Sequence, residues 1–157
     1  MQDSAGSVSK DRLRLWLRLL KSSRLIEAQL RERFRSEFAS TLPRFDVMAA
    51  LSQHPGGLKM SALSGVLRVS NGNVTGIIDR LTNEGLVERF SVPGDRRAAL
   101  VRLTAAGETE FTDQAAQHEA WVNSLLGVIS QGEVNALTEK MDSLVSALIE
   151  QEDRADG

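Results

Sequence analysis

The period of the hydrophobic pattern changes within residues 60–103, and this change constrains the fold more than any other feature. Residues 60–67 and 71–84 carry apolar side chains at helical spacing, with a short turn between them. Residues 86–89 and 99–103 then alternate as strands do. Two short helices joined by a tight turn form a helix-turn-helix, and the strands form a hairpin. We therefore expect a mainly α chain with a small β-hairpin, organised as a winged helix-turn-helix lobe over residues 41–104.

The two short helices carry end signals of different strength. Lys59 stands where a capping side chain is expected before the first of them, which should cost about 1 kcal/mol. We expect its inward face to hold Leu63, Val66 and Leu67. Ser70 fits as the cap of the second helix, and Gly85 fits as its C-terminal glycine.

Amphipathic segments precede this lobe. Apolar residues recur at helical spacing from Asp11 to about Phe38, and early in this helix they cover too much of its circumference for one packing partner. Thr41 and Pro43 then begin a short helix that ends at the breaker residues 54–57.

Further amphipathic segments follow the lobe. Thr104 caps a long helix whose apolar face continues to Ile129, where residues 130–132 break it. After this break, apolar residues recur at near-heptad spacing from Val134 to Leu148 and form a second apolar face. Such terminal helices cannot bury all their apolar surface in a small domain. We expect residues 10–38 and 105–152 to form a dimerisation layer.

The composition limits the other classes of protein to which the chain could belong. The 157 residues, 41% hydrophobic and 25% charged, fit one globular domain over residues 1–157. With no cysteine and only two histidines, we expect no metal and no cofactor. We see neither a signal peptide nor an apolar run of bilayer length, so we expect a cytoplasmic protein without a membrane partner.

The formal net charge of −2 hides an uneven distribution. Basic residues dominate residues 1–35 and 58–103, whereas acidic residues dominate from Thr104 onwards. This separation of basic and acidic segments indicates that the basic part of the chain binds a polyanion. The alternative is a set of solvated helix faces.

The helix over residues 71–84 places its apolar residues on one side and small polar residues on the other. Val74, Ile77, Ile78 and Leu81 form the inward stripe. Two glycines in an exposed helix cost about 1 kcal/mol each, and close approach to another surface would account for them. Small hydrogen-bonding side chains around them suit a DNA major groove, although neutral drift in a tolerant helix remains the alternative. The candidate major-groove residues are Ser70, Asn71, Gly72, Asn73, Thr75, Gly76 and Arg80.

The hairpin adds a basic turn over residues 93–97. Arg96 and Arg97 suit the negative potential of a narrow minor groove, and Asp95 could hold Arg97 in position. The alternative is a solvated polar turn. Further basic residues would contact phosphates, which position a protein without reading sequence. The candidate phosphate contacts are Lys59, Arg68, Arg89 and Arg102. Arg80, already a candidate for the major groove, is also a candidate phosphate contact.

The order of these elements resembles the MarR family of bacterial regulators. The residues that carry the resemblance are 69–75 (VSNGNVT), 78–81 (IDRL), 84–89 (EGLVER), 95–97 (DRR) and 101–104 (VRLT). The resemblance covers nearly the whole chain, and the string from Val69 to Thr104 is highly specific.

The resemblance implies a homodimer on a pseudo-palindromic operator in double-stranded DNA, acting as a ligand-responsive repressor. It places the helix over residues 70–83 in the major groove and the hairpin tip in the minor groove. It also implies release by small, often aromatic or phenolic, effectors in a cleft between the dimer layer and the DNA-binding lobe. Two departures, Lys59 for a capping threonine and Asn71 for a frequent arginine, mean that the target sequence cannot be taken from relatives. The absence of cysteine excludes the peroxide-sensing branch.

Candidate effector residues near the expected cleft are Trp16, Arg18, Arg44, His118 and Trp121. Each has a core or surface role as the alternative. A winged-helix module that binds protein rather than DNA is the competing function, favoured by the sequence pI of about 5.7.

An enzyme fits least, and we expect no catalytic residues. Ser7 and Lys10 match the S-x-x-K nucleophile pattern, but they lie in a polar tail without partner groups.

Overall fold

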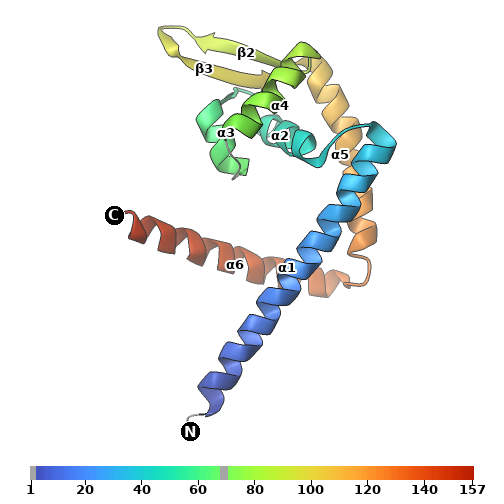
Figure 1. The fold of residues 1–157 in the computed structure, drawn as a ribbon, viewed down its shortest axis with the longest axis vertical. Helices are drawn as coiled ribbons and strands as arrows, with labels where there is room; N and C mark the ends of the chain where they lie inside the picture. Colours follow the sequence, from blue (N-terminus) through green and yellow to red (C-terminus); the bar gives the residue numbers. More distant parts are fainter. Residues whose placement is uncertain (1–2, 68–70) are drawn as a thin grey trace. The chain divides into compact units, whose positions relative to one another are not determined.

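The computed structural model describes residues 3–67 and 71–157, with the backbone alone at residues 3–5, 71–72 and 96–98. These residues form two compact units, divided after Trp121. The elements in chain order are α1 (Asp3–Phe38), α2 (Leu42–Ser52), β1 (Leu58–Lys59), α3 (Met60–Leu67), α4 (Asn71–Asn83), β2 (Val87–Val92), β3 (Asp95–Leu103), α5 (Ala105–Leu125) and α6 (Gln131–Ala155) (Figure 1). The mainly helical fold with a small hairpin is confirmed.

Helices α2, α3 and α4 pack with the sheet around one hydrophobic core. The side chains of Met48, Leu63, Val74, Ile78 and Leu81 are completely buried there. Val87 and Val101 cover this core from the sheet. The helix-turn-helix pattern is therefore stabilised by its apolar stripes, as expected.

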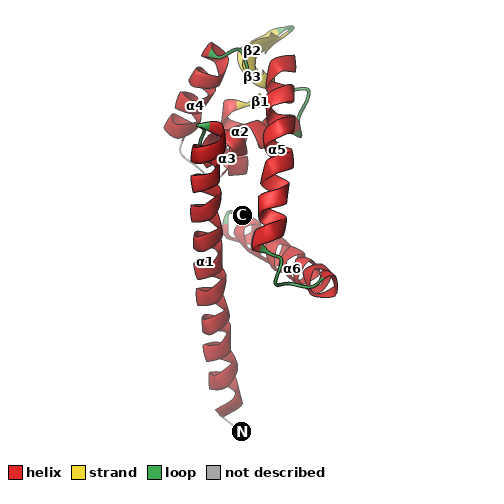
Figure 2. Ribbon diagram, turned by 90° about the vertical axis from the view of Figure 1, so that its right-hand side faces the viewer, coloured by secondary structure: helices red, strands yellow, loops and turns green. Residues whose placement is uncertain are grey.

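The sheet is antiparallel with the order β1-β3-β2 (Figure 2). The strand β1 is not among the elements that the sequence predicts; in it Leu58 lies opposite Val101 and Lys59 lies opposite Leu100. Lys59 is thus the last residue of a strand and directly precedes the first residue of α3, Met60. A strand this short gives no alternation to detect.

The hairpin strands are longer than predicted, and the turn consists of Pro93 and Gly94, with Gly94 at a φ of +93°. Asp95 begins β3, so residues 95–97 lie in a strand rather than in the turn. The register shifts between Ser91, opposite Ala99, and Val92, opposite Asp95. Polar strand ends carry no alternating apolar signal, which explains the wrong boundary.

Val66 on α3 is also a correction, because it is 60% exposed rather than inward. The buried side of α3 holds Leu63 and Ser64, with Met60 and Leu67 packed partly against the core. These four positions have the i, i+3, i+4, i+7 spacing of one helix face, and Val66 lies outside it.

The long helices begin and end differently from our expectation. α1 starts at Asp3 rather than near Asp11, because solvated helical residues give no periodic apolar signal. α5 ends at Leu125, before Ile129. Ser130 is the N-cap of α6 in a capping box with Glu133, so this segment starts a helix as well as separating two.

An aromatic cluster joins α1, α2 and α5 within the first unit. The ring of Phe34 lies 4.9 Å from that of Phe45 and 5.3 Å, edge-on, from that of Trp121. Phe111 stacks on Phe45 at 5.6 Å. This cluster fixes the C-terminal end of α1 against the winged-helix lobe.

Candidate nucleic-acid interface

The outer face of α4 is open to solvent. Asn73, Thr75 and Arg80 are exposed there. A Cβ atom on Gly76 would meet no atom within 4 Å, so nothing in the described structure packs against this glycine. Asn71 and Gly72 are described by their backbone alone, and Ser70 lies outside the described residues. The described part of the predicted major-groove surface is small, polar and unoccupied by the chain's own side chains.

The C-terminal end of α4 is closed by Gly85, as expected. Gly85 has a φ of +76°, its N–H donates to the carbonyl of Thr82, and the N–H of Leu86 donates to that of Leu81. This pair of hydrogen bonds is the Schellman motif. Thr104 Oγ1 donates to the carbonyl of Gly85 at 2.6 Å.

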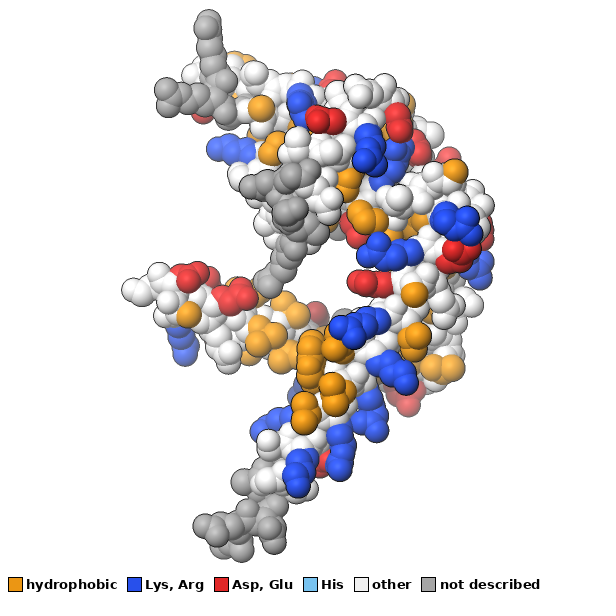
Figure 3. All heavy atoms as spheres, viewed as in Figure 1, with side chains coloured by type: hydrophobic (Ala, Val, Ile, Leu, Met, Phe, Trp, Pro, Cys, Tyr) orange, Lys and Arg blue, Asp and Glu red, His pale blue; other side chains and the backbone are white. Residues whose placement is uncertain are grey.

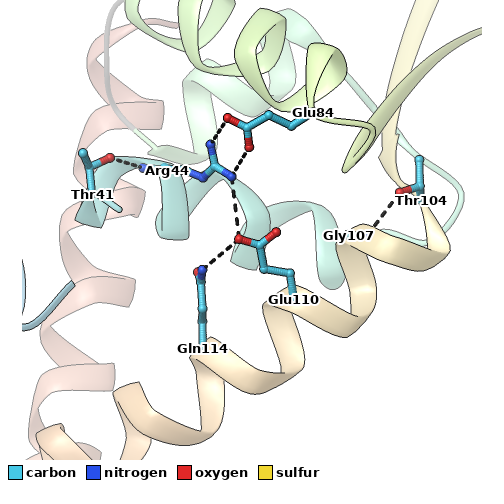
Figure 4. A network of polar contacts seen from close by, with 7 residues as sticks. All are labelled: Thr41, Arg44, Glu84, Thr104, Gly107, Glu110 and Gln114. Atoms are coloured by element: carbon cyan, nitrogen blue, oxygen red, sulfur yellow. Dashed lines mark hydrogen bonds and ion pairs between the residues drawn. The ribbon is translucent and has the colours of Figure 1, made fainter. Parts of the chain in front are cut away.

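Three helices meet in a polar network at this end of α4 (Figure 4). Arg44 of α2 donates through Nη1 to Glu84 Oε1 at 2.9 Å and through Nη2 to Glu84 Oε2. Its Nη2 also lies 3.7 Å from Oε1 of Glu110 on α5. The Arg44 guanidinium lowers the pKa of Glu84, and hydrogen bonding to Glu84 raises that of Arg44. The ion pair between Arg44 and Glu84 therefore stabilises the charged form of both side chains.

The base of the wing is held by an aromatic contact. The Arg102 guanidinium lies 4.2 Å from the centre of the Phe90 ring. A Cβ on Gly57 would lie 2.9 Å from the edge atoms Cε1 and Cζ of the same ring, and Gly57 has a φ of +92°. Only glycine therefore fits this position without strain.

Two of the predicted phosphate contacts are already paired with carboxylates. Arg89 Nη2 lies 2.5 Å from Asp79 Oδ1, which joins β2 to α4. Arg102 Nε lies 2.6 Å from Glu88 Oε1. Lys59 and Arg80 are exposed and have no ion-pair partner within residues 3–67 and 71–157.

The remaining basic candidates are described in part or not at all. Arg68 lies outside the described residues, and Arg96 and Arg97 are described by their backbone alone. Asp95 is exposed at the start of β3.

The structure brings together only two of the five effector candidates. His118 and Trp121 belong to the aromatic cluster, where the His118 ring lies 4.7 Å from that of Phe45. Burial lowers the pKa of His118, and the charge of Asp46 opposes that shift. Burial also raises the pKa of Asp46. Both groups are thus disfavoured in their charged forms.

The other three candidates lie elsewhere. Trp16 is 55% exposed on α1, and it precedes Phe34 by about 27 Å along the helix at 1.5 Å per residue. Arg18 donates to the carbonyl of Arg14 on the same helix. Arg44 is engaged by Glu84 and Glu110.

Glu84 and Gly107 are the site residues that sequence reasoning missed. A glutamate at a helix C-terminus opposes the helix macrodipole, and this was the available signal that Glu84 needs a cation. Gly107 lies in the first turn of α5, where its local sequence carries no sign of a close contact. Both act through residues that are distant in the sequence.

Other kinds of site find no support in the described structure. Residues 3–67 and 71–157 contain no cluster of histidine and carboxylate side chains that could hold a metal ion. None of the helices in these segments has the length and apolar character required to span a bilayer.

The fold and the open α4 face define a winged helix-turn-helix protein, and comparisons with known proteins identify its family. The MarR family model matches residues 40–99. A crystal structure of a MarR family transcriptional regulator from Silicibacter pomeroyi is 30% identical, with a TM-score of 0.73, and the match covers 89% of this chain and 96% of that one. The chain belongs to the MarR family of transcriptional regulators.

Further similar proteins are regulators too. The HTH-type transcriptional regulator YfiV of Bacillus subtilis is 31% identical over 108 residues, which are 69% of this chain and 67% of YfiV. A mutant of MarR from Escherichia coli, crystallised with operator DNA, is 25% identical, with a TM-score of 0.71 and coverage of 85% and 95% of the two chains.

Proposed function

We propose that this regulator binds double-stranded DNA as a homodimer, with the outer face of α4 in the major groove and the β2–β3 hairpin at the minor groove. The open position of Gly76 carries this proposal, because a glycine with free space on an exposed helix serves close approach to another surface. The complex of the similar Escherichia coli protein with operator DNA supports it.

The proposed contacts divide into three classes. Asn73, Thr75 and Arg80, together with Ser70 and Asn71, would present hydrogen-bonding groups to base edges. Gly72 and Gly76 would allow the helix to approach the bases closely. Lys59, Arg68, Arg89 and Arg102 would bind phosphates, as would Arg80 in a second role. Arg96 and Arg97 would enter the minor groove with support from Asp95.

The proposed domain is single, with residues 41–104 as the DNA-binding lobe and residues 10–38 and 105–152 as dimerisation helices. Apolar side chains gather along α1 and along α6, and basic side chains surround those of α1 (Figure 3). On α1, Leu13, Trp16 and Leu17 are each more than half exposed. On α6, Val145 and Leu148 are about half exposed. A second copy of the chain would bury both surfaces.

Family membership also supports the finer parts of the proposal. The protein would act in the cytoplasm as a repressor that a small aromatic or phenolic effector releases from a pseudo-palindromic operator. It would have no catalytic activity and no cofactor. The effector candidates remain Trp16, Arg18, Arg44, His118 and Trp121, of which His118 and Trp121 also serve the aromatic cluster.

Fluorescence anisotropy with a duplex from the region upstream of the chain's own gene tests DNA binding. We expect a complex whose log affinity falls linearly with log salt concentration. Arg96→Ala together with Arg97→Ala should abolish most of the affinity, whereas Arg35→Ala, a basic residue paired with Glu32 on α1, should preserve it. If the wild-type chain forms no salt-sensitive complex, the module that binds protein replaces this proposal.

Light scattering after size-exclusion chromatography tests the homodimer. We expect twice the 17.2 kDa of one chain. Val145→Glu places a charge in the apolar seam of α6 and should give monomers, whereas Ser143→Glu on the opposite side of the helix should not. A wild-type chain that runs as a monomer contradicts the proposal.

A further inference from the structure

We infer that Arg44 is a positioning residue for α4, acting through Glu84, and that this contact sets the register of the recognition surface. The inference rests on the proposed DNA binding. Arg44 itself lies on α2, is 19% exposed at its side chain, and is not one of the proposed DNA contacts.

The apolar underside of α4 cannot set that register alone. Val74, Ile78 and Leu81 fix how deeply the helix lies on the core, but hydrophobic contacts are non-directional and tolerate small sliding or rotation. The directional side-chain contacts that join α4 to other elements, among the described residues, include the Asp79–Arg89 pair and the bidentate pair of Glu84 with Arg44 at the C-terminal end. A bidentate guanidinium–carboxylate pair adds geometric specificity that a point charge does not supply.

Arg44 is itself held from two sides. The backbone N–H of Arg44 donates to the capping Oγ1 of Thr41 at 3.3 Å, which fixes the start of α2. On the far side, Glu110 contacts the same guanidinium and accepts a hydrogen bond from Gln114 Nε2 at 3.2 Å. Gln114 is 97% buried, as its 3% exposure shows. Arg44 therefore joins α4 to two helices that do not face the proposed groove.

Glu84 is otherwise an unfavourable choice at this position. A carboxylate at the C-terminal end of a helix opposes the macrodipole, and near DNA it would repel phosphates. Charge alone thus predicts that Glu84→Gln tightens DNA binding. Positioning through Arg44 predicts the opposite sign, which makes this variant decisive.

The experiment uses the full chain and the duplex that the wild-type protein selects from a random pool. Glu84→Gln and Arg44→Gln should each raise Kd about tenfold, and the double variant should add little, because coupled residues act as a unit. The slope of log affinity against log salt should not change, since no phosphate contact is lost. Arg44→Lys should recover part of the affinity. Arg35→Gln, which removes a bidentate pair with Glu32 on α1, is the control and should leave Kd unchanged.

Amide hydrogen exchange of the free protein supplies an arm that does not need DNA. The amides of Gly85 and Leu86, which close α4, should exchange faster in Arg44→Gln and Glu84→Gln and at the wild-type rate in Arg35→Gln. If the wild-type chain selects no DNA, the proposed function is rejected, and the role of Arg44 in setting the register of the recognition surface is rejected with it. The exchange rates would still show whether the Arg44–Glu84 pair stabilises the C-terminal end of α4. If the wild-type chain binds but Glu84→Gln binds equally or more tightly, or if Arg44→Gln lowers the salt slope by about 1 as a phosphate contact would, the inference is wrong.

Discussion

Gly107, in the first turn of α5, lies directly against the backbone of Leu86, because a Cβ at position 107 would approach the Leu86 carbonyl oxygen to 2.0 Å. Leu86 joins α4 to β2, and its carbonyl also accepts a hydrogen bond from the N–H of Thr104 at 3.0 Å. The start of α5 thus fixes the segment between the proposed recognition helix and the wing.

We expect Gly107→Ala to lower the free energy of unfolding by about 2 kcal/mol or more, because the contact is with backbone and overpacking of this kind is costly. Urea denaturation measures the effect. Gly6→Ala on α1 has no atom within 4 Å of the new Cβ and is the control, expected to be neutral or stabilising by up to about 1 kcal/mol. Equal stability of the two variants would show that the close contact is absent.

Gly76→Ala should separate stability from DNA binding. The free space at this position predicts that alanine stabilises α4 by about 1 kcal/mol, because glycine is a poor helix former. The same methyl group would stand between α4 and the base edges, so affinity for the selected duplex should fall. Thermal unfolding and anisotropy on the same preparation measure both effects, and unchanged affinity would remove Gly76 from the interface.

The cations of the lobe should contribute unequally to the salt dependence of binding. Arg80→Gln and Lys59→Gln should each reduce the slope of log affinity against log salt by about 1, because both side chains are free to neutralise a phosphate. Arg102→Gln should reduce it less, since Glu88 already neutralises Arg102. An equal reduction in all three variants would mean that the Arg102–Glu88 pair opens on DNA.

The local signals of this sequence predicted the elements around α4 well. The stripe of Val74, Ile78 and Leu81, the glycine at position 85 and the cap at Thr104 each act within a few residues of the chain, so their patterns are visible without coordinates. The short strand β1 depends on pairing with β3, which lies far along the chain. The exposure of Val66 depends on which of two possible faces of α3 packs against the core.

At the candidate site, too, the features set by neighbouring residues could be predicted from the sequence, and those set by distant residues could not. The composition of the outer face of α4 indicated an open surface, which the structure places at Asn73, Thr75 and Gly76. The pairing of Arg44 with Glu84 spans forty positions and has no local pattern. The sequence therefore indicates Arg44 only as an effector candidate, and its contacts with the carboxylates of Glu84 and Glu110 are visible only in the structure.

Stability should fall as the solution is acidified below about pH 6.5, through His118. Its pKa is lowered by burial from the ordinary value of 6.5, so protons bind the unfolded chain before they bind the folded one. The contribution is complete above pH 6.5 and is lost as the pH falls towards the folded pKa. Urea unfolding at pH 7.5 and pH 5.5 measures this slope, which should be shallower in His118→Gln. An unchanged slope in that variant would assign the effect to other groups.

Selection of bound fragments from a random pool of duplex DNA tests the central claim most directly. Paired copies of the α4 surface predict enrichment of a pseudo-palindrome whose half-sites are about 34–36 Å apart, one turn of B-DNA. A pool that stays unenriched after repeated rounds, or a single half-site without symmetry, would contradict an account built on two recognition helices reading one face of the duplex.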